Sequence, residues 1–85
     1  MAWVYLLRCS DGSLYTGWTV DVDRRLAAHA AGTASRYTRS RLPVRLEAAW
    51  QLPDRSTAMR EEARIKRLPR AQKLALIAGG APVAG

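Results

Sequence analysis

The stretch Trp3–Trp18 constrains the fold most, because it predicts a β-hairpin. Two short segments rich in strand-forming residues flank the turn sequence Ser-Asp-Gly-Ser at 10–13. Turn length decides which side chains share a face. A two-residue turn at Asp11-Gly12 would place Tyr5 and Tyr15 on opposite faces of the hairpin.

A three-residue loop gives a different pairing. With Gly12 in the left-handed conformation, Cys9 would pair with Ser13 and Tyr5 with Gly17. Tyr5 and Tyr15 would then share one face as diagonal neighbours, and Gly17 would leave open space beside the Tyr5 ring. Only this second register brings the two tyrosines together.

The rest of the chain predicts further helices and one more strand. The expected elements are a helix capped by Thr19 or Asp21 and ending near Ala31, a loop at 33–43, a strand at 44–52, a helix capped by Asp54 or Ser56 and ending near Leu68, and a short helix at 70–78. This order predicts an α+β domain with a small, largely antiparallel sheet. We expect one domain at 1–78 and a flexible tail at 79–85.

Apolar spacing predicts which residues are buried. The expected buried sets are Val22, Leu26 and Ala30 in the first helix, Leu46, Ala48 and Trp50 in the last strand, Ala58, Met59, Ala63, Ile65 and Leu68 in the second long helix, and Leu74 and Ile77 in the final helix.

The formal net charge of +7 favours an acidic partner. The chain has 14 Lys and Arg against 7 Asp and Glu, and all the basic residues except Lys66 and Lys73 are arginines. Guanidinium groups suit forked contacts with phosphate, and small basic chains without a membrane segment most often bind nucleic acid. An arginine- and alanine-rich composition is also typical of GC-rich genomes, so charge alone leaves both interpretations open.

Cysteine usage and hydropathy predict a cytoplasmic protein. Cys9 is the only cysteine, which fits a reducing compartment. No apolar run approaches the ~18 residues of a membrane helix, and the N-terminus lacks the pattern of a signal peptide. We expect a monomer that does not associate with membranes.

Polar residues after the hairpin are candidates for a functional surface. Arg25 and His29 are four residues apart and share a helix face. The loop at 33–43 interleaves arginines with an aromatic residue, in the order Arg36, Tyr37, Arg39 and Arg41. Such a loop suits a surface that tracks a phosphate backbone and stacks on bases. The alternatives are a solvated surface pair and a solvated loop.

Glu62 is expected near the middle of the apolar face of the second long helix. A carboxylate there must be paired, hydrogen-bonded or bound to a metal, because burying it alone is too costly. An ordinary ion pair with Lys66, one turn on, is the simpler alternative. One carboxylate near tyrosines and Arg25 also suits phosphodiester hydrolysis with Mg²⁺, which keeps several of its waters.

Taken in order, these motifs resemble the GIY-YIG nuclease family. The matching segments are Trp3-Val4-Tyr5, Tyr15-Thr16-Gly17, Asp21-Val22-Asp23-Arg24-Arg25 followed by His29, and Glu62-Ala63-Arg64-Ile65-Lys66. In the first of these segments, only the tyrosine is identical to the family motif. The loop GTASRYTRSRLPV and the ending IKRLPRAQKLALI are similar to the small stand-alone bacterial branch. The resemblance covers about residues 2–78, and the order and spacing of the motifs are more specific than any one of them.

The resemblance implies a three-stranded antiparallel sheet flanked by helices, in the order β-β-α-β-α-α. It also implies a DNA endonuclease that depends on Mg²⁺ or Mn²⁺, with branched, nicked or damaged DNA in repair as the expected substrate. The implied catalytic residues are Tyr5, Tyr15, Arg25, His29 and Glu62. Among them Glu62 holds the metal, and we favour Tyr5 as the general base with Tyr15 assisting.

The implied nucleic-acid contacts are Gly17, Arg36, Tyr37, Arg39, Arg41 and Lys66. Because the family site contains both tyrosines, the resemblance also requires the three-residue-loop register.

Two departures from the family leave other functions open. Many members carry a late asparagine near the site, and this chain has none. We also expect no second DNA-binding domain, so phosphate contacts should dominate and binding should depend on salt. The alternatives are a non-catalytic nucleic-acid-binding module and an adaptor for an acidic protein. RNA is an alternative substrate, and a protein partner could recruit the chain.

Overall fold

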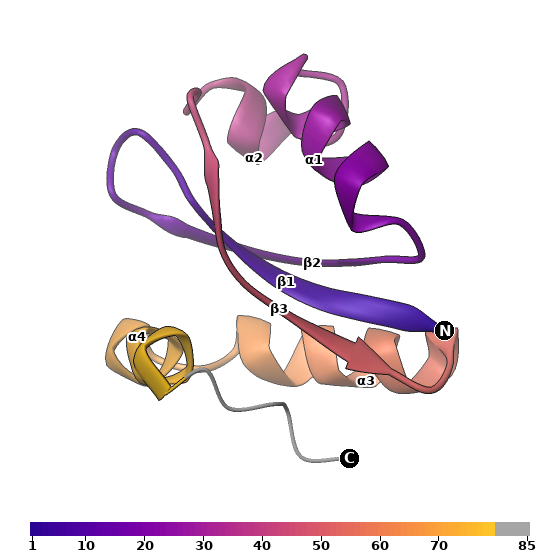
Figure 1. Cartoon of the computed structure of the whole chain (residues 1–85). Coiled ribbons are helices and arrows are strands. Elements are labelled where there is room, and N and C mark those ends of the chain that lie inside the picture. Colours follow the sequence, from indigo (N-terminus) through magenta and orange to yellow (C-terminus); the bar gives the residue numbers. More distant parts are fainter. Residues whose placement is uncertain (80–85) are drawn as a thin grey trace.

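A three-stranded antiparallel sheet lies at the centre of the computed structural model, which describes residues 1–79 (Figure 1). The elements are β1 (Ala2–Arg8), β2 (Leu14–Thr19), α1 (Val22–Ala30), α2 (Arg36–Arg39), β3 (Arg45–Leu52), α3 (Arg55–Lys66) and α4 (Arg70–Gly79). β1 is the central strand, with β2 and β3 at the edges. The predicted fold class is confirmed, and α2 is an additional short helix in the segment expected to be a loop.

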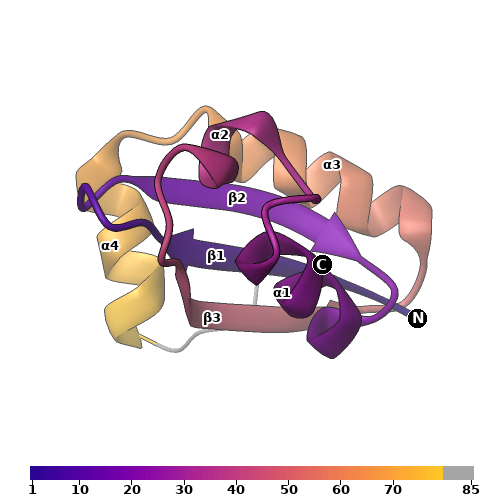
Figure 2. The same ribbon diagram turned by 90° about the horizontal axis from the view of Figure 1, so that it is seen from above.

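The helices form two layers on opposite faces of the sheet. α1 and α2 lie on one face, and α3 and α4 lie on the other (Figures 1 and 2). β2 therefore runs between α2 and α3. Within residues 1–79 no helix has the length and apolar character needed to cross a membrane. All of the segment expected to be flexible, except Gly79 at the end of α4, lies outside the described residues.

The hairpin has the three-residue loop. Cys9 N donates a hydrogen bond to Ser13 O, and Gly12 N donates to Cys9 O, both at 2.9 Å. Gly12 has a φ of +84°, in the left-handed region. Tyr5 pairs with Gly17, as this register predicts.

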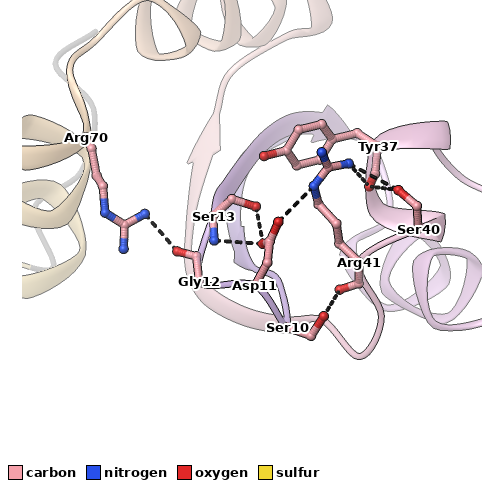
Figure 3. Close-up of polar contacts among 8 residues, drawn as sticks. All are labelled: Ser10, Asp11, Gly12, Ser13, Tyr37, Ser40, Arg41 and Arg70. Carbon is pink, nitrogen blue, oxygen red and sulfur yellow. Dashed lines mark hydrogen bonds and ion pairs between the residues drawn. The ribbon is translucent and has the colours of Figure 1, made fainter.

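The tip of the hairpin is held by both helical layers (Figure 3). Ser10 N donates to Arg41 O at 2.9 Å, and Arg41 Nε donates to the Asp11 carboxylate at 3.0 Å. From the other layer, the Arg70 guanidinium donates to Gly12 O at 2.7 Å. Because Arg41 follows α2 and Arg70 begins α4, these contacts tie the tip to both layers.

Aspartates cap α1 and α3. Asp21 accepts a hydrogen bond from Arg24 N at 3.1 Å, and Asp54 accepts one from Thr57 N at 2.7 Å. α1 ends just before Gly32, which has a φ of +78°. Of the two candidate caps for each helix, the aspartate is therefore the one used.

The main core lies between the sheet and α3. Its buried residues are Ala2, Val4, Leu6, Trp50, Leu52, Ala58 and Ile65, and the partly buried Trp18, Ala48, Leu68, Leu76 and Ile77 pack against it. The prediction for Ile77 is confirmed. Leu76, rather than the expected Leu74, is the other α4 side chain that packs on this core.

A β-bulge in β3 changes the expected burial. Leu6 pairs with Ala48, but Leu7 pairs with Leu46, so the pairing skips Glu47. Leu46 therefore points to the same side as Leu7, away from the main core, and is 39% exposed. The prediction that Leu46 faces the core is wrong, because one extra residue breaks the alternation.

Two helices also bury different residues from those expected. In α1 His29 is buried and Ala30 is exposed. In α3 the outer positions Met59 and Ala63 are exposed, and both predictions of burial are wrong. A helix that packs on one face of a small sheet has neighbours along a narrower stripe than the sequence pattern suggests.

Replacing Gly12 with alanine should destabilise the protein by about 1–2 kcal/mol, because an L side chain at this φ is strained. Beyond its chain neighbours, no atom lies within 4 Å of the position that a Cβ would take, so the cost should be conformational. Gly12→Asn is the matched control, since asparagine tolerates the left-handed region better. Urea denaturation would compare the three proteins, and equal losses in both variants would contradict this explanation.

Candidate active site

The Tyr5 ring lies across Gly17, its partner in the neighbouring strand. A Cβ at position 17 would lie 2.6 Å from Tyr5 Cζ, closer than side-chain atoms pack. The space expected beside the ring is thus occupied by the ring itself. Gly17 lets the hydroxyl end of Tyr5 lie over β2, so its role in the structure is to position Tyr5.

A chain of hydrogen bonds runs from Tyr5 into the layer of α1 and α2. Tyr5 Oη is 2.8 Å from His29 Nε2, and His29 Nδ1 is 2.8 Å from Thr38 Oγ1. All three side chains are buried, and His29 and Thr38 are completely so. The hydrogen bonds at both ring nitrogens explain how a polar side chain occupies the buried position expected for Ala30.

Thr38 was not predicted from the sequence. It lies in the segment expected to be a loop, and its contact with His29 is made only in the folded chain. The only indication in the sequence was that Thr38 lies in a segment similar to the corresponding loop of the stand-alone family branch.

Tyr15 completes an aromatic cluster around His29. The ring centroids of Tyr5 and Tyr15 are 6.4 Å apart, and both rings make edge-to-face contacts with His29. Tyr15 also stacks with Tyr37 of α2, and their ring centroids are 5.9 Å apart. The structure therefore brings both predicted tyrosines and the predicted histidine into one site.

Arg25 lies close enough to influence this cluster electrostatically. The pKa of the Tyr5 hydroxyl is raised, chiefly by burial and then by Tyr15, while Arg25 opposes this rise and Glu62 adds to it. The pKa of His29 is lowered, first by burial and then by the charge of Arg25. Among residues 1–79 Arg25 forms no ion pair, so its guanidinium is available to an anion.

Glu62 approaches the site from the opposite layer. Its side chain is 20% exposed, and its carboxylate is 3.6 Å from Lys66 Nζ, which is the ion pair considered from the sequence. Its negative charge adds a small contribution to the raised pKa of the Tyr5 hydroxyl. Neighbouring Glu61 pairs instead with Arg64 at 3.0 Å.

The described residues contain no group of three or more His, Cys, Asp or Glu that could hold a metal. A metal at this site would therefore take Glu62 as its one acidic ligand. That donor set fits Mg²⁺, which binds through one or two carboxylates and keeps several waters.

A basic cavity lies along β2 beside the aromatic cluster. It has a volume of about 430 Å³ and is lined by Leu14, Tyr15, Thr16, Tyr37, Lys66 and Lys73. Lys66 Nζ is 6.0 Å from the centroid of the Tyr15 ring. Lys73 is a cationic residue of this cavity that sequence reasoning missed, because its place depends on how α4 packs.

The arginines around α2 have different surroundings. The Arg41 guanidinium lies 3.9 Å from the centroid of the Tyr37 ring and forms an ion pair with Asp11 (Figure 3). These contacts within the fold already occupy much of its hydrogen-bonding capacity. Arg36 and Arg39 are exposed on α2 and form no ion pair among the described residues. Of the predicted nucleic-acid contacts on α2, these two are the most accessible to phosphate.

Gly17→Ala should destabilise the protein by about 1–3 kcal/mol, because the added Cβ overlaps the Tyr5 ring. In a Tyr5→Val background the same substitution should be neutral or stabilising, since alanine loses less entropy than glycine in a strand. Urea denaturation of the four proteins in this double-mutant cycle gives the coupling. If Gly17→Ala lowers the free energy of unfolding equally in both backgrounds, the overlap with the Tyr5 ring is not the cause.

The stability of the protein should fall as pH drops below about 6.5, because the lowered pKa of His29 means that the unfolded chain binds its proton first. The contribution of His29 to the free energy of unfolding is complete above the pKa of histidine in the unfolded chain. It is lost as the pH falls toward the lower pKa of His29 in the folded protein. Asp11 and Asp54 have lowered pKa values and titrate at more acidic pH. Urea denaturation between about pH 7.5 and 5 should show a flatter dependence for His29→Gln. Parallel curves would contradict this assignment.

The chain is similar to proteins of a known domain family. Residues 1–75 match the model of the GIY-YIG catalytic domain. A UPF0213 protein of Halobacterium salinarum is 55% identical over 73 residues, which cover 86% of this chain and 95% of that protein. UPF0213 protein BH0048 of Halalkalibacterium halodurans is 51% identical over 75 residues, covering 88% and 80%.

Two solution NMR structures have the same fold. The UPF0213 protein BH0048 from Bacillus halodurans matches with a TM-score of 0.59 at 49% identity, covering 92% of this chain and 84% of that one. The protein EF2693 from E. faecalis matches with a TM-score of 0.61 at 38% identity, covering 91% and 82%. The chain therefore belongs to the GIY-YIG catalytic domain family, which is a family of nucleases.

Proposed function

We propose that the protein is a metal-dependent endonuclease that hydrolyses phosphodiester bonds in DNA. The observation that carries this proposal is the buried hydrogen bond between Tyr5 and His29, at a site that Arg25 and Glu62 influence by charge. A binding surface has no need of a tyrosine hydroxyl joined to a neutral histidine. Such a pair is suited to moving a proton.

The surroundings of Tyr5 explain why it needs His29. Burial raises the pKa of the Tyr5 hydroxyl, which disfavours a free phenolate. His29 is neutral at pH 7 because its pKa is lowered, and its Nε2 lies 2.8 Å from Tyr5 Oη. Tyr5 can therefore take a proton from the attacking water while its own proton moves to His29. The two side chains act together as a base, and Tyr15 beside them can contact the water or the phosphate.

Charged groups around this pair would stabilise the reacting phosphate. Arg25 supplies a guanidinium for the added negative charge of the transition state. Glu62 would hold Mg²⁺ or Mn²⁺, and Lys66 at 3.6 Å keeps its carboxylate oriented. When bound, the metal supplies stabilisation of the leaving oxygen.

The basic cavity along β2 favours DNA with an unpaired strand over an intact duplex. Its walls combine the Tyr15 ring with the ammonium groups of Lys66 and Lys73, a combination suited to a stacked base and its phosphate. Arg36 and Arg39 extend the basic surface onto α2. Branched or damaged DNA in repair is therefore the substrate that we propose, with strongly salt-dependent binding.

The proposed setting is the cytoplasm. Cys9 is a buried free thiol, which suits a reducing compartment. We propose a monomer, to which a protein partner could add sequence or structure preference.

The ion pair between Glu62 and Lys66 favours a second candidate function. If Lys66 holds this carboxylate permanently, the same surface would bind nucleic acid without cleaving it. Binding would then persist when divalent metals are chelated.

Nicking of supercoiled plasmid with Mg²⁺ or Mn²⁺ tests the nuclease. Glu62→Gln and Arg25→Ala should each lower the nicking rate on the order of 10²-fold or more. The first removes the proposed carboxylate ligand of the metal, and the second removes a positive charge that would stabilise the transition state. EDTA should abolish nicking. Circular dichroism and gel-shift binding would show that the variants fold and still bind DNA.

Two neighbours provide matched controls. Glu61→Gln changes a carboxylate that pairs with Arg64, and Arg24→Ala changes the arginine next to Arg25, so both should keep near wild-type activity. If Glu62→Gln and the wild type show the same EDTA-resistant trace of cutting, the nuclease proposal is wrong and the binding module becomes the better explanation.

A further inference from the structure

Thr38 lies behind His29, on the side of the ring away from Tyr5. Its Oγ1 is 2.8 Å from His29 Nδ1, and a longer contact of 3.4 Å joins it to the carbonyl oxygen of Ser35. The side chain is completely buried, so it touches neither solvent nor substrate. Any effect of Thr38 on the reaction must therefore pass through His29.

The hydrogen-bonding groups in this chain indicate where the protons lie. A neutral imidazole carries one N–H, on either Nδ1 or Nε2. With the proton on Nδ1, Thr38 accepts it, and the Thr38 hydroxyl donates to Ser35 O. His29 Nε2 is then a free acceptor for the Tyr5 hydroxyl. In this arrangement every proton of the chain has an acceptor.

The other tautomer leaves a proton without a partner. With the proton on Nε2, the ring would donate to Tyr5 Oη, and the Tyr5 hydroxyl would have to donate elsewhere. Tyr5 is 3% exposed, and its hydroxyl has no other hydrogen-bond partner among residues 1–79, so it could donate only to the water whose proton it is proposed to accept. In this form the Thr38 hydroxyl would also have to donate to His29 Nδ1 and give up its contact with Ser35 O. The Nδ1–H form is therefore favoured.

We propose that Thr38 is a positioning residue that holds His29 as the Nδ1–H tautomer and so makes Nε2 the acceptor of the Tyr5 proton. The catalytic consequence rests on the proposed nuclease function. The tautomer itself is a property of the folded protein and does not depend on any activity.

A hydroxyl performs this role without adding charge. The titratable groups facing His29 are Tyr5 from β1, Tyr15 from β2 and Arg25 from α1, and Glu62 from α3 acts on Tyr5. Of these, Arg25 opposes a charged imidazole, as does burial. A carboxylate in the place of Thr38 would favour the imidazolium, whose Nε2 is already protonated and cannot accept a proton. Threonine orients the ring and leaves it neutral.

The first test measures the tautomer directly in the intact wild-type protein. Long-range ¹H–¹⁵N NMR at about pH 7.5, above the ordinary pKa of histidine, distinguishes a protonated Nδ1 from a protonated Nε2. We expect His29, the only histidine, to show the Nδ1–H pattern. A dominant Nε2–H pattern would overturn the proposal. Because no cleavage is measured, this result is independent of whether the protein is a nuclease.

The second test removes the hydroxyl with little change in shape. Thr38→Val should move His29 toward the Nε2–H tautomer, whereas Thr38→Ser should keep the Nδ1–H form. In the plasmid assay, Thr38→Val should lower kcat about tenfold or more with little change in KM, and Thr38→Ser should restore it. If His29 in folded Thr38→Val remains entirely Nδ1–H, Thr38 is not what fixes the tautomer. If that variant does not fold, the serine variant decides, and a shift to Nε2–H there overturns the proposal.

Discussion

The pairing register between β1 and β2 determines whether this chain has a site at all. Side chains alternate between the faces of a strand, so a shift of one residue would send Tyr5 and Tyr15 to opposite sides of the sheet. The three-residue loop with Gly12 at φ +84° sets the register. It places Tyr5 opposite Gly17, the one residue type over which the ring can lie. Contacts from Arg41 and Arg70 then hold the loop in place.

The site separates neutral groups from charged ones. Inside, uncharged hydrogen bonds join Tyr5, His29 and Thr38, and burial keeps them neutral. Toward the surface, Arg25 and Glu62 supply opposite charges from different helical layers. In the proposed reaction, protons would move through this interior chain while the phosphate and metal charges stay outside. Tyr15 lies on β2, an edge strand of the sheet, and Tyr5 lies on the central strand β1.

Much of this could be predicted from local patterns. The Asp-Gly turn, the aspartate caps and the four-residue spacing of Arg25 and His29 are local signals, and each corresponds to a feature of the structure. Three features had no such signal. α2 has four residues, too few for a periodic pattern. The bulge at Glu47 follows from how β3 pairs, and the burial of His29 follows from partners that lie elsewhere in the chain.

The overlap of Tyr5 with Gly17 has a consequence for how such a sequence can drift. While position 5 is a tyrosine, any side chain at position 17 overlaps the ring and destabilises the fold. Once the tyrosine is lost, that restriction disappears and many residues become acceptable. Regaining the site would then require two changes, neither of which is useful alone. Mutational tolerance at position 17 therefore records whether a lineage has kept Tyr5, and the loss of both residues would be close to irreversible.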